Sequence, residues 1–175
     1  MVRRQFRHYL VKATQDPCLT MSPIDILVDD LRGPEIENLL QTHLDHMRAI
    51  SPPESVHALD LDALRKPQIT FWTMWQAGTL IGCGALRELD PQHGEIKSMH
   101  TPLSMRGKGY ARRMVAHILD EARRRGYKRL SLETGATDDF IAARSLYAAF
   151  GFQTCAPFGD YFDDPFSTCM TLELE

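Results

Sequence analysis

The chain has 175 residues, of which 43% are hydrophobic, so it is long enough for one packed domain and too short for two ordinary ones. A net charge of −3 at pH 7 gives no electrostatic basis for nucleic-acid binding, and we expect no such partner. No stretch approaches the roughly 18 apolar residues of a membrane span, so we expect no membrane partner.

The first 20 residues differ from the rest of the chain in charge. Four basic residues against one acidic residue give this segment +3, which leaves −6 for residues 21–175. The segment lacks the apolar core of a secretory signal, and we interpret it as a disordered basic tail, with a basic anchor or transit-like peptide as the alternative. The four cysteines are scattered without a Cys-x-x-Cys pair, which favours a reduced, cytoplasmic protein.

Hydrophobic periodicity and turn residues predict the elements of the N-terminal half. In chain order these are a strand at 24–28, a helix from Pro34 to about Ile50, a second short helix from Ser51 to about Lys66, and strands at 69–75 and 80–88. The intervening Gln76-Ala77-Gly78-Thr79 is typical of a hairpin turn.

The C-terminal half alternates strands with helices. The predicted elements are a strand at 95–101, a helix at 109–125, a strand at 128–134, a helical run at 138–150 before Gly151, and strands at 152–156 and 166–174. The order is therefore β-α-α-β-β-β-α-β-α-β-β within a single domain at 21–175. In the 138–150 helix, Ile141, Leu146, Ala149 and Phe150 are predicted to form one buried face.

The turn at 106–111 carries the clearest functional signal. Small residues at Gly107, Gly109 and Ala111 let a ligand approach the backbone, because at most a methyl group stands in the way. The free N–H groups of the following helix point toward such a ligand and favour negative charge, and Arg106 and Lys108 add positive charge. The turn therefore predicts a pyrophosphate cradle, with a tight strand-to-helix turn lacking any ligand as the alternative.

Two common phosphate motifs do not fit this turn. A P-loop run is absent, and a dinucleotide-binding turn would need a third glycine where Arg112 stands. The turn instead fits Arg-x-x-Gly-x-Ala, with Arg106, Gly109 and Ala111 as its defined positions. This pattern resembles the acyl-CoA pyrophosphate loop of the GNAT N-acetyltransferase superfamily.

A second motif strengthens the resemblance. Leu146-Tyr147-x-x-x-Gly151-Phe152 is similar to the C-terminal motif of the same superfamily and follows the loop at the usual distance. The resemblance covers roughly residues 22–173. Within the superfamily, the segment Pro157–Tyr161 is similar to one shared by a group of small bacterial acetyltransferases.

The resemblance implies an α/β fold with one mixed sheet, in which the strands at 95–101 and 128–134 are parallel neighbours. It implies transfer of an acetyl group from acetyl-CoA, as co-substrate, to the primary amine of a small molecule. Two alternatives stay open, a non-catalytic acyl-CoA-binding or sensory domain and a protein N-acetyltransferase. A homodimer is also left open.

The resemblance places the cofactor contacts on the strand that enters the loop and on the loop itself. These contacts are Met99, Thr101, Arg106, Gly107, Lys108, Gly109, Tyr110 and Ala111. One departure is that Asp138-Asp139-Phe140 stand where many members carry an asparagine that binds CoA.

Acetyl transfer requires a neutral amine and a proton for the departing thiolate. The resemblance implies Tyr147 as the general acid and Glu95 as the base, with Glu133 as the competing base. Since Lys97 shares a strand face with Glu95, a plain ion pair between them is another interpretation. Deprotonation of the amine by solvent is a third.

The acceptor pocket is expected to come from the first two helices and the C-terminal hairpin. Its candidate residues are His43, His46, Ser51, Ser55, His57, Asp160 and Tyr161. His43 and His46 share a helix face in the manner of a metal pair, but no third ligand is signalled nearby, so we expect a pocket-lining pair and no metal.

Overall fold

The computed structural model describes residues 23–175 apart from 56, 58 and 59. The tail predicted at 1–20 lies outside the described residues. Among the helices that the structure describes, none combines the length and the apolar character needed to cross a bilayer.

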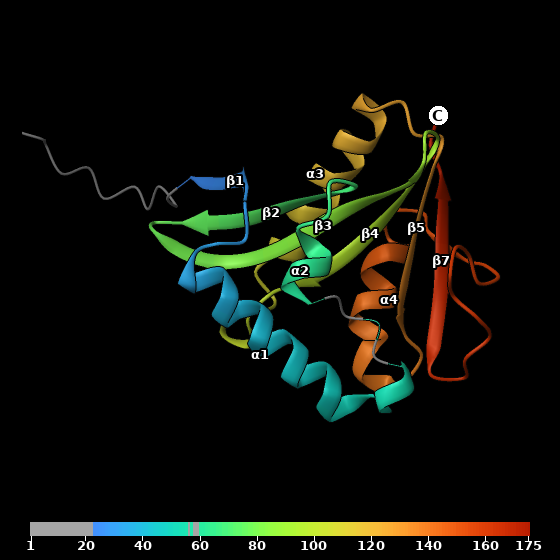
Figure 1. Ribbon diagram of the computed structural model, residues 1–175, viewed down its shortest axis with the longest axis horizontal. Helices are drawn as coiled ribbons and strands as arrows, with labels where there is room; N and C mark the ends of the chain where they lie inside the picture. Colours follow the sequence, from blue (N-terminus) through green and yellow to red (C-terminus); the bar gives the residue numbers. More distant parts are fainter. Residues whose placement is uncertain (1–22, 56, 58–59) are drawn as a thin grey trace, which may run out of the picture.

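The core of the fold is a seven-stranded mixed sheet in the order β1-β2-β3-β4-β5-β7-β6 (Figure 1). The strands are β1 (Ile24–Val28), β2 (Ile69–Gln76), β3 (Thr79–Asp90), β4 (His93–His100), β5 (Arg129–Gly135), β6 (Gln153–Thr154) and β7 (Ser167–Glu173). The pairing of β4 with β5 is parallel, and the other pairings are antiparallel. These results confirm the predicted element order and the parallel neighbours.

Helices cover both faces of the sheet (Figure 1). The helical segments are α1 (Pro34–Ile50), η1 (Pro53–Ser55), α2 (Leu61–Leu64), η2 (Leu103–Met105), α3 (Tyr110–Arg124), η3 (Asp138–Phe140) and α4 (Ile141–Ala148). Buried residues of α3 and α4 form one hydrophobic cluster with the sheet, and buried residues of α1 and α2 form a second cluster with β2 and β3.

The α3 helix anchors the larger core. Its apolar residues recur at helical spacing, so one stripe, from Met114 through Ile118 to Ala122, is fully buried against the sheet. The helix approaches β3 at Gly84, where an added Cβ would lie 2.8 Å from Met114 Cγ. Only a glycine at this position allows such close packing.

Strands β4 and β5 are paired for only part of their length. Their register runs from His93 opposite Arg129 to Ile96 opposite Leu132, and no pair follows in the described chain. On its other side, β4 has a register shift against β3, and Ser98 within it has φ +52°, a value that few residues other than glycine adopt. The two strands therefore part beyond Ile96.

Several element boundaries differ from the sequence prediction. The predicted helix from Ser51 to Lys66 is instead the separate turns η1 and α2, and the Asp60 side chain, which accepts a hydrogen bond from Ala63 N, caps the new start at α2. The predicted 138–150 helix begins as η3 and ends at Ala148, and β6 is only two residues long. The predicted buried face of this helix is partly wrong, since Ile141 is 50% exposed and Ala149 is also exposed.

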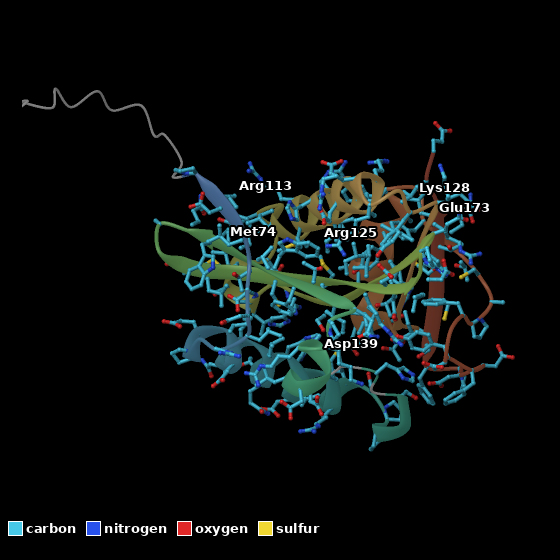
Figure 2. All side chains as sticks on the ribbon, turned by 45° about the horizontal axis from the view of Figure 1, so that its top comes forward. Met74, Arg113, Arg125, Lys128, Asp139 and Glu173 are labelled. Atoms are coloured by element: carbon cyan, nitrogen blue, oxygen red, sulfur yellow. The ribbon has the colours of Figure 1, made fainter. Side chains whose placement is uncertain are left out.

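Truncation of the α3 stripe should destabilise the domain. We expect Ile118→Ala to lower the free energy of unfolding by about 2–5 kcal/mol, because the buried cavity cannot collapse fully. Arg113→Ala is the control on the same helix, since this exposed side chain points away from the sheet (Figure 2), and it should change stability by less than about 0.5 kcal/mol. Urea unfolding measures both values, and equal losses would contradict the packing described here.

Candidate active site

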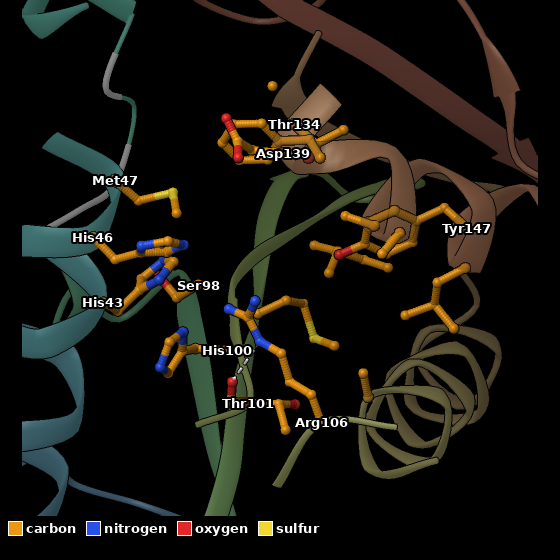
Figure 3. Close-up of a pocket in the computed structure, with 18 of the residues that line it drawn as sticks. His43, His46, Met47, Ser98, His100, Thr101, Arg106, Thr134, Asp139 and Tyr147 are labelled. Carbon is orange, nitrogen blue, oxygen red and sulfur yellow. Dashed lines mark hydrogen bonds between the residues drawn. The ribbon is translucent and has the colours of Figure 1, made fainter. Parts of the chain in front are cut away.

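A cavity of about 440 Å³ lies where β4 and β5 part (Figure 3). Its walls come from the C-terminal half of β4, the end of β5, the 105–112 loop, and the helical segments α1, η1, η3 and α4. Because the strands part, helices that pack in two separate hydrophobic clusters, α4 in one and α1 in the other, line the same cavity.

One end of the cavity is a cradle of unpaired backbone donors. In the described chain, the N–H groups of residues 107–112 donate to no other backbone group, and the first bond of this kind runs from Arg113 N to Gly109 O at 3.2 Å. Gly107 and Gly109 have φ of +76° and +82°, and a Cβ on either would meet no protein atom within 4 Å. Open space in front of free N–H groups at a helix N-terminus suits a phosphate.

The two basic side chains of this loop lie differently. The exposed Lys108 has its Nζ 3.6 Å from Met105 Sδ, and it is not among the residues that line the cavity. Arg106 lines the cavity and donates from Nε to the carbonyl oxygen of Thr101 at 3.3 Å. The remaining predicted cofactor contacts, Met99, Thr101, Tyr110 and Ala111, all line the cavity.

Tyr147 is placed at the cavity by α4. The side chain is buried, lines the cavity and packs edge-on against Phe152 with 5.7 Å between ring centroids. Burial, and to a lesser extent the nearby Glu133 carboxylate, raises the pKa of the phenol well above its ordinary value of 10.0. The phenol therefore keeps its proton at neutral pH and is a hydrogen-bond donor.

Glu133 lines the same cavity from the end of β5. Its Oε1 accepts a hydrogen bond from Ser167 Oγ at 2.6 Å. Burial raises the pKa of this carboxyl, while the hydrogen bond from Ser167 and the charges of His57 and Lys97 partly offset that rise. A raised pKa in a cavity is what a general base for an amine requires.

Glu95 is placed differently from Glu133. It is 0% exposed, it pairs with Ser131 where β4 and β5 are still joined, and it does not line the cavity. Its Oε1 accepts from Lys97 Nζ at 3.0 Å and from Tyr161 Oη at 2.6 Å, while Oε2 lies 3.5 Å from Arg87. The ion pair between Glu95 and Lys97, one of the interpretations from the sequence, is present.

The candidate acceptor residues fall into two groups. His43, His46, Ser51, Ser55 and His57 line the cavity from α1, η1 and the segment after it.

The other two candidates lie outside the cavity lining. Asp160 is exposed and lies 3.6 Å from Arg87, and Tyr161 contacts Glu95 and Lys97. Tyr161 also packs edge-on against His57, which does line the cavity, with 5.1 Å between ring centroids.

Other lining residues were not predicted from the sequence. Lys97, Ser98 and His100 line the cavity from β4, and Asp139 does so from η3. Alternation along β4 could have indicated Lys97, two residues before Met99, but the irregular backbone at Ser98 disturbs that alternation. Among the described residues, no group of three or more His, Cys, Asp or Glu is arranged to hold a metal ion.

Comparison with known proteins agrees with this geometry. The sequence profile of the acetyltransferase (GNAT) family matches residues 35–152. Over 149 residues, the chain is 54% identical to YsnE, an uncharacterized N-acetyltransferase of Bacillus subtilis, and 46% identical to YedL, an uncharacterized N-acetyltransferase of Escherichia coli. These alignments cover 85% of this chain in both cases, with 99% of YsnE and 94% of YedL.

Two further similarities extend the comparison. The chain is 42% identical to an IAA acetyltransferase of Azospirillum brasilense, over 70% of this chain and 80% of that protein. Among solved structures, an acetyltransferase of Bacillus subtilis in complex with CoA matches with a TM-score of 0.66 at 21% identity, over 87% of this chain and 100% of that chain. The structural match supports the fold.

The two glutamates should respond oppositely to replacement by glutamine. Glu95→Gln leaves the buried Lys97 without its counter-charge and should cost about 3–5 kcal/mol of unfolding free energy at pH 7. The pKa of Glu133 is raised in the fold, so its contribution to stability is present below its ordinary pKa of 4.5 and is lost as pH rises through the raised value. Glu133→Gln should therefore leave stability at pH 7 unchanged or higher.

Urea unfolding of both variants at pH 7 tests this contrast. An equal loss of unfolding free energy in the two variants would contradict the contrast, because it would mean that Glu133 stabilises the fold as much as Glu95 does.

Proposed function

The chain belongs to the acetyltransferase (GNAT) family, and we propose that it transfers the acetyl group of acetyl-CoA to the primary amine of a small molecule. One observation carries the proposal. A single cavity joins the free N–H groups of the 107–112 cradle to a protonated phenol at Tyr147 and a high-pKa carboxyl at Glu133.

We assign the CoA side of the cavity to backbone groups. The 107–112 cradle takes the pyrophosphate, since its donors and the helix dipole favour negative charge. Beyond Ile96, the edge of β4 is no longer paired with β5, so its backbone groups can bond an extended amide-bearing chain as a further strand would. The pantetheine arm of CoA has this chemistry.

The cavity residues supply both proton transfers. The Glu133 carboxylate takes a proton from the acceptor ammonium, and the free amine attacks the thioester carbonyl carbon to form the new C–N bond. As the C–S bond breaks, Tyr147 donates its proton to the departing sulfur, and the second proton of the amine nitrogen then restores the Tyr147 hydroxyl. Glu133 releases the first proton to solvent. The products are an N-acetyl amide and CoA.

The dimensions of the cavity favour a small acceptor. Its volume of about 440 Å³ is within the common range of roughly 300–1,000 Å³ for small-molecule sites, and the acyl arm must share it. The helical segments α1 and η1 form the wall opposite Tyr147 (Figure 3).

Release of free thiol from acetyl-CoA across a panel of amines, with mass spectrometry of the products, tests the proposal. Hydrolysis alone, with no amine acetylated, would overturn it.

The cradle can be tested with two matched glycines. Gly109→Ala should weaken CoA binding by roughly tenfold or more, because the new methyl group occupies space that the phosphate needs. Gly126→Ala is the control, since Gly126 has a similar φ of +78° at the far end of α3, equally open surroundings and no place in the cavity lining. Calorimetry with CoA measures both, and equal affinities in the two variants would contradict the cradle.

Loss of the Tyr147 hydroxyl should slow turnover. Because general acid catalysis contributes about 10²–10⁴-fold, Tyr147→Phe should lower kcat by at least roughly tenfold and leave CoA affinity unchanged. Tyr127→Phe is the control, because it removes another buried phenol oxygen, bonded to Glu88 at 3.0 Å outside the cavity lining. Equal effects of the two variants on kcat would assign Tyr147 a packing role.

The acidic limb of the pH–rate profile should belong to Glu133. Because Glu133 must be ionised to accept a proton, kcat/KM should fall as pH drops through its raised pKa, and Glu133→Gln should abolish this limb. His57→Gln should move the limb to higher pH, since the positive charge of His57 lowers the pKa of Glu133. A limb that persists in Glu133→Gln but disappears in Glu95→Gln would pass the role to Glu95.

A further inference from the structure

Lys97 and Glu133 face each other across the start of the opening between β4 and β5. The parallel register ends with Ile96 opposite Leu132, so one further step would place Lys97 opposite Glu133. Residues that lie opposite each other on neighbouring strands project from the same face of a sheet. The two side chains therefore share a face, and both residues line the cavity.

These two opposite charges do not pair. Glu133 forms no ion pair with any described residue, and its Oε1 accepts a hydrogen bond from Ser167 Oγ at 2.6 Å. The Lys97 ammonium instead donates to Glu95 Oε1 at 3.0 Å and to Tyr161 Oη at 2.6 Å. Lys97 is thus bonded to groups other than the carboxylate that its position in the register would favour.

The Tyr161 hydroxyl completes the arrangement that holds Lys97. It accepts a hydrogen bond from the ammonium and donates one to the same Glu95 oxygen, at 2.6 Å in both cases. Burial, together with the Glu95 carboxylate, raises the pKa of this phenol well above its ordinary value of 10.0. The hydroxyl therefore keeps the proton that it donates to Glu95.

The position of Tyr161 is set by the segment Pro157–Tyr161, which the sequence analysis singled out. The Tyr161 ring packs edge-on against Phe158 and against His57, with 5.1 Å between ring centroids in both contacts. Phe158 in turn packs against His93 at 5.8 Å. No residue of the segment lines the cavity, so its direct contact with a cavity residue of β4 is the bond from Lys97 to Tyr161.

We propose that Tyr161 and Glu95 hold Lys97 back from Glu133, so that the Glu133 carboxylate stays unpaired and open to the acceptor amine. Tyr161 and Lys97 are then positioning residues, and this inference rests on the proposed acetyl transfer. An ammonium that is near Glu133 but bonded elsewhere favours the ionised carboxylate without occupying it. A direct ion pair would occupy the oxygen atoms that have to take the proton of the acceptor.

Several other groups surround Glu133 and its partner Ser167. Positive charge on His57 lowers the pKa of Glu133, as Lys97 does, whereas the Glu95 carboxylate raises it. Burial raises the pKa of the Tyr147 phenol, and that of the Cys169 thiol to about 11, so both are uncharged at neutral pH. By element, the titratable and charged groups are His57 after η1, Glu95 and Lys97 of β4, Asp139 of η3, Tyr147 of α4, Tyr161 and Asp164 before β7, and Cys169 of β7.

The test removes the Tyr161 hydroxyl and follows the ionisation of Glu133 itself. Carbon-13 NMR of the side-chain carboxyl groups measures the pKa of Glu133 without any substrate, and Glu133→Gln identifies its resonance. Tyr161→Phe frees Lys97 to pair with Glu133, so the pKa of Glu133 should fall. Lys97→Met removes the cation, so the pKa of Glu133 should rise.

Turnover separates the position of Lys97 from its charge. In Tyr161→Phe, kcat/KM on the pH plateau should fall by roughly tenfold, a part of the about 10²–10⁴-fold that general base catalysis contributes, because the new ion pair occupies Glu133. Adding Lys97→Met to Tyr161→Phe should restore most of this loss at a pH above the pKa of Glu133, since no ammonium is left to pair. A purely structural role of Tyr161 predicts no such rescue.

Tyr127→Phe is the matched control. It also removes a buried phenol that donates to a glutamate oxygen, in this case Glu88 Oε2 at 3.0 Å, outside the cavity lining. It should leave both the pKa of Glu133 and the plateau of kcat/KM at their wild-type values, which would exclude a general effect of losing a phenol.

Three outcomes overturn the inference. The first is a pKa of Glu133 that rises or stays unchanged in Tyr161→Phe, and the second is a loss of kcat/KM that Lys97→Met does not restore. The third is a pKa of Glu133 that does not rise in Lys97→Met, which decides the matter if Tyr161→Phe does not fold. If no amine is acetylated, the proposed function fails, and the NMR titrations alone then decide whether Lys97 is held back from Glu133.

Discussion

The site depends on the point at which β4 and β5 stop pairing. Four residue pairs hold the strands together up to Ile96 and Leu132, and the irregular backbone at Ser98 then carries β4 away from β5. If the pairing continued, the edge of β4 would be bonded to β5, and the cavity between α1 and α4 would be closed. The parting therefore opens the cavity, which in the proposed function holds both the extended acyl carrier and the acceptor amine.

The same parting places the two glutamates in different environments. Glu95 lies where the strands are joined, so it is enclosed and compensated by Lys97 and Arg87. Glu133 lies one residue beyond the last pair, so it faces the cavity, where it forms no ion pair with any described residue and burial raises its pKa. Lys97 links the two, because it binds Glu95 and also acts on the pKa of Glu133.

The sequence predicted the fold and the loop more completely than the rest of the site. The 109–125 helix and the turn before it have local signals, an apolar stripe and small residues, and the structure has α3 at 110–124, preceded by the glycine turn. Local signals could not rank Glu95 against Glu133, because their burial depends on where a long-range strand pairing ends. The orientation of the Arg106 side chain depends on its hydrogen bond to the Thr101 carbonyl, and the separate start of α2 depends on the Asp60 cap. Hydrophobic periodicity in the sequence predicts neither contact.

The central claim, that CoA lies along the parted strands and on the 107–112 cradle, is tested most directly by an amide NMR titration with CoA. The account predicts that the largest shifts fall on the N–H groups of residues 107–112 and on residues 97–101 of β4, since these backbone groups gain hydrogen bonds. Saturable CoA binding that leaves both segments unshifted, with the changes elsewhere on the sheet, would contradict it.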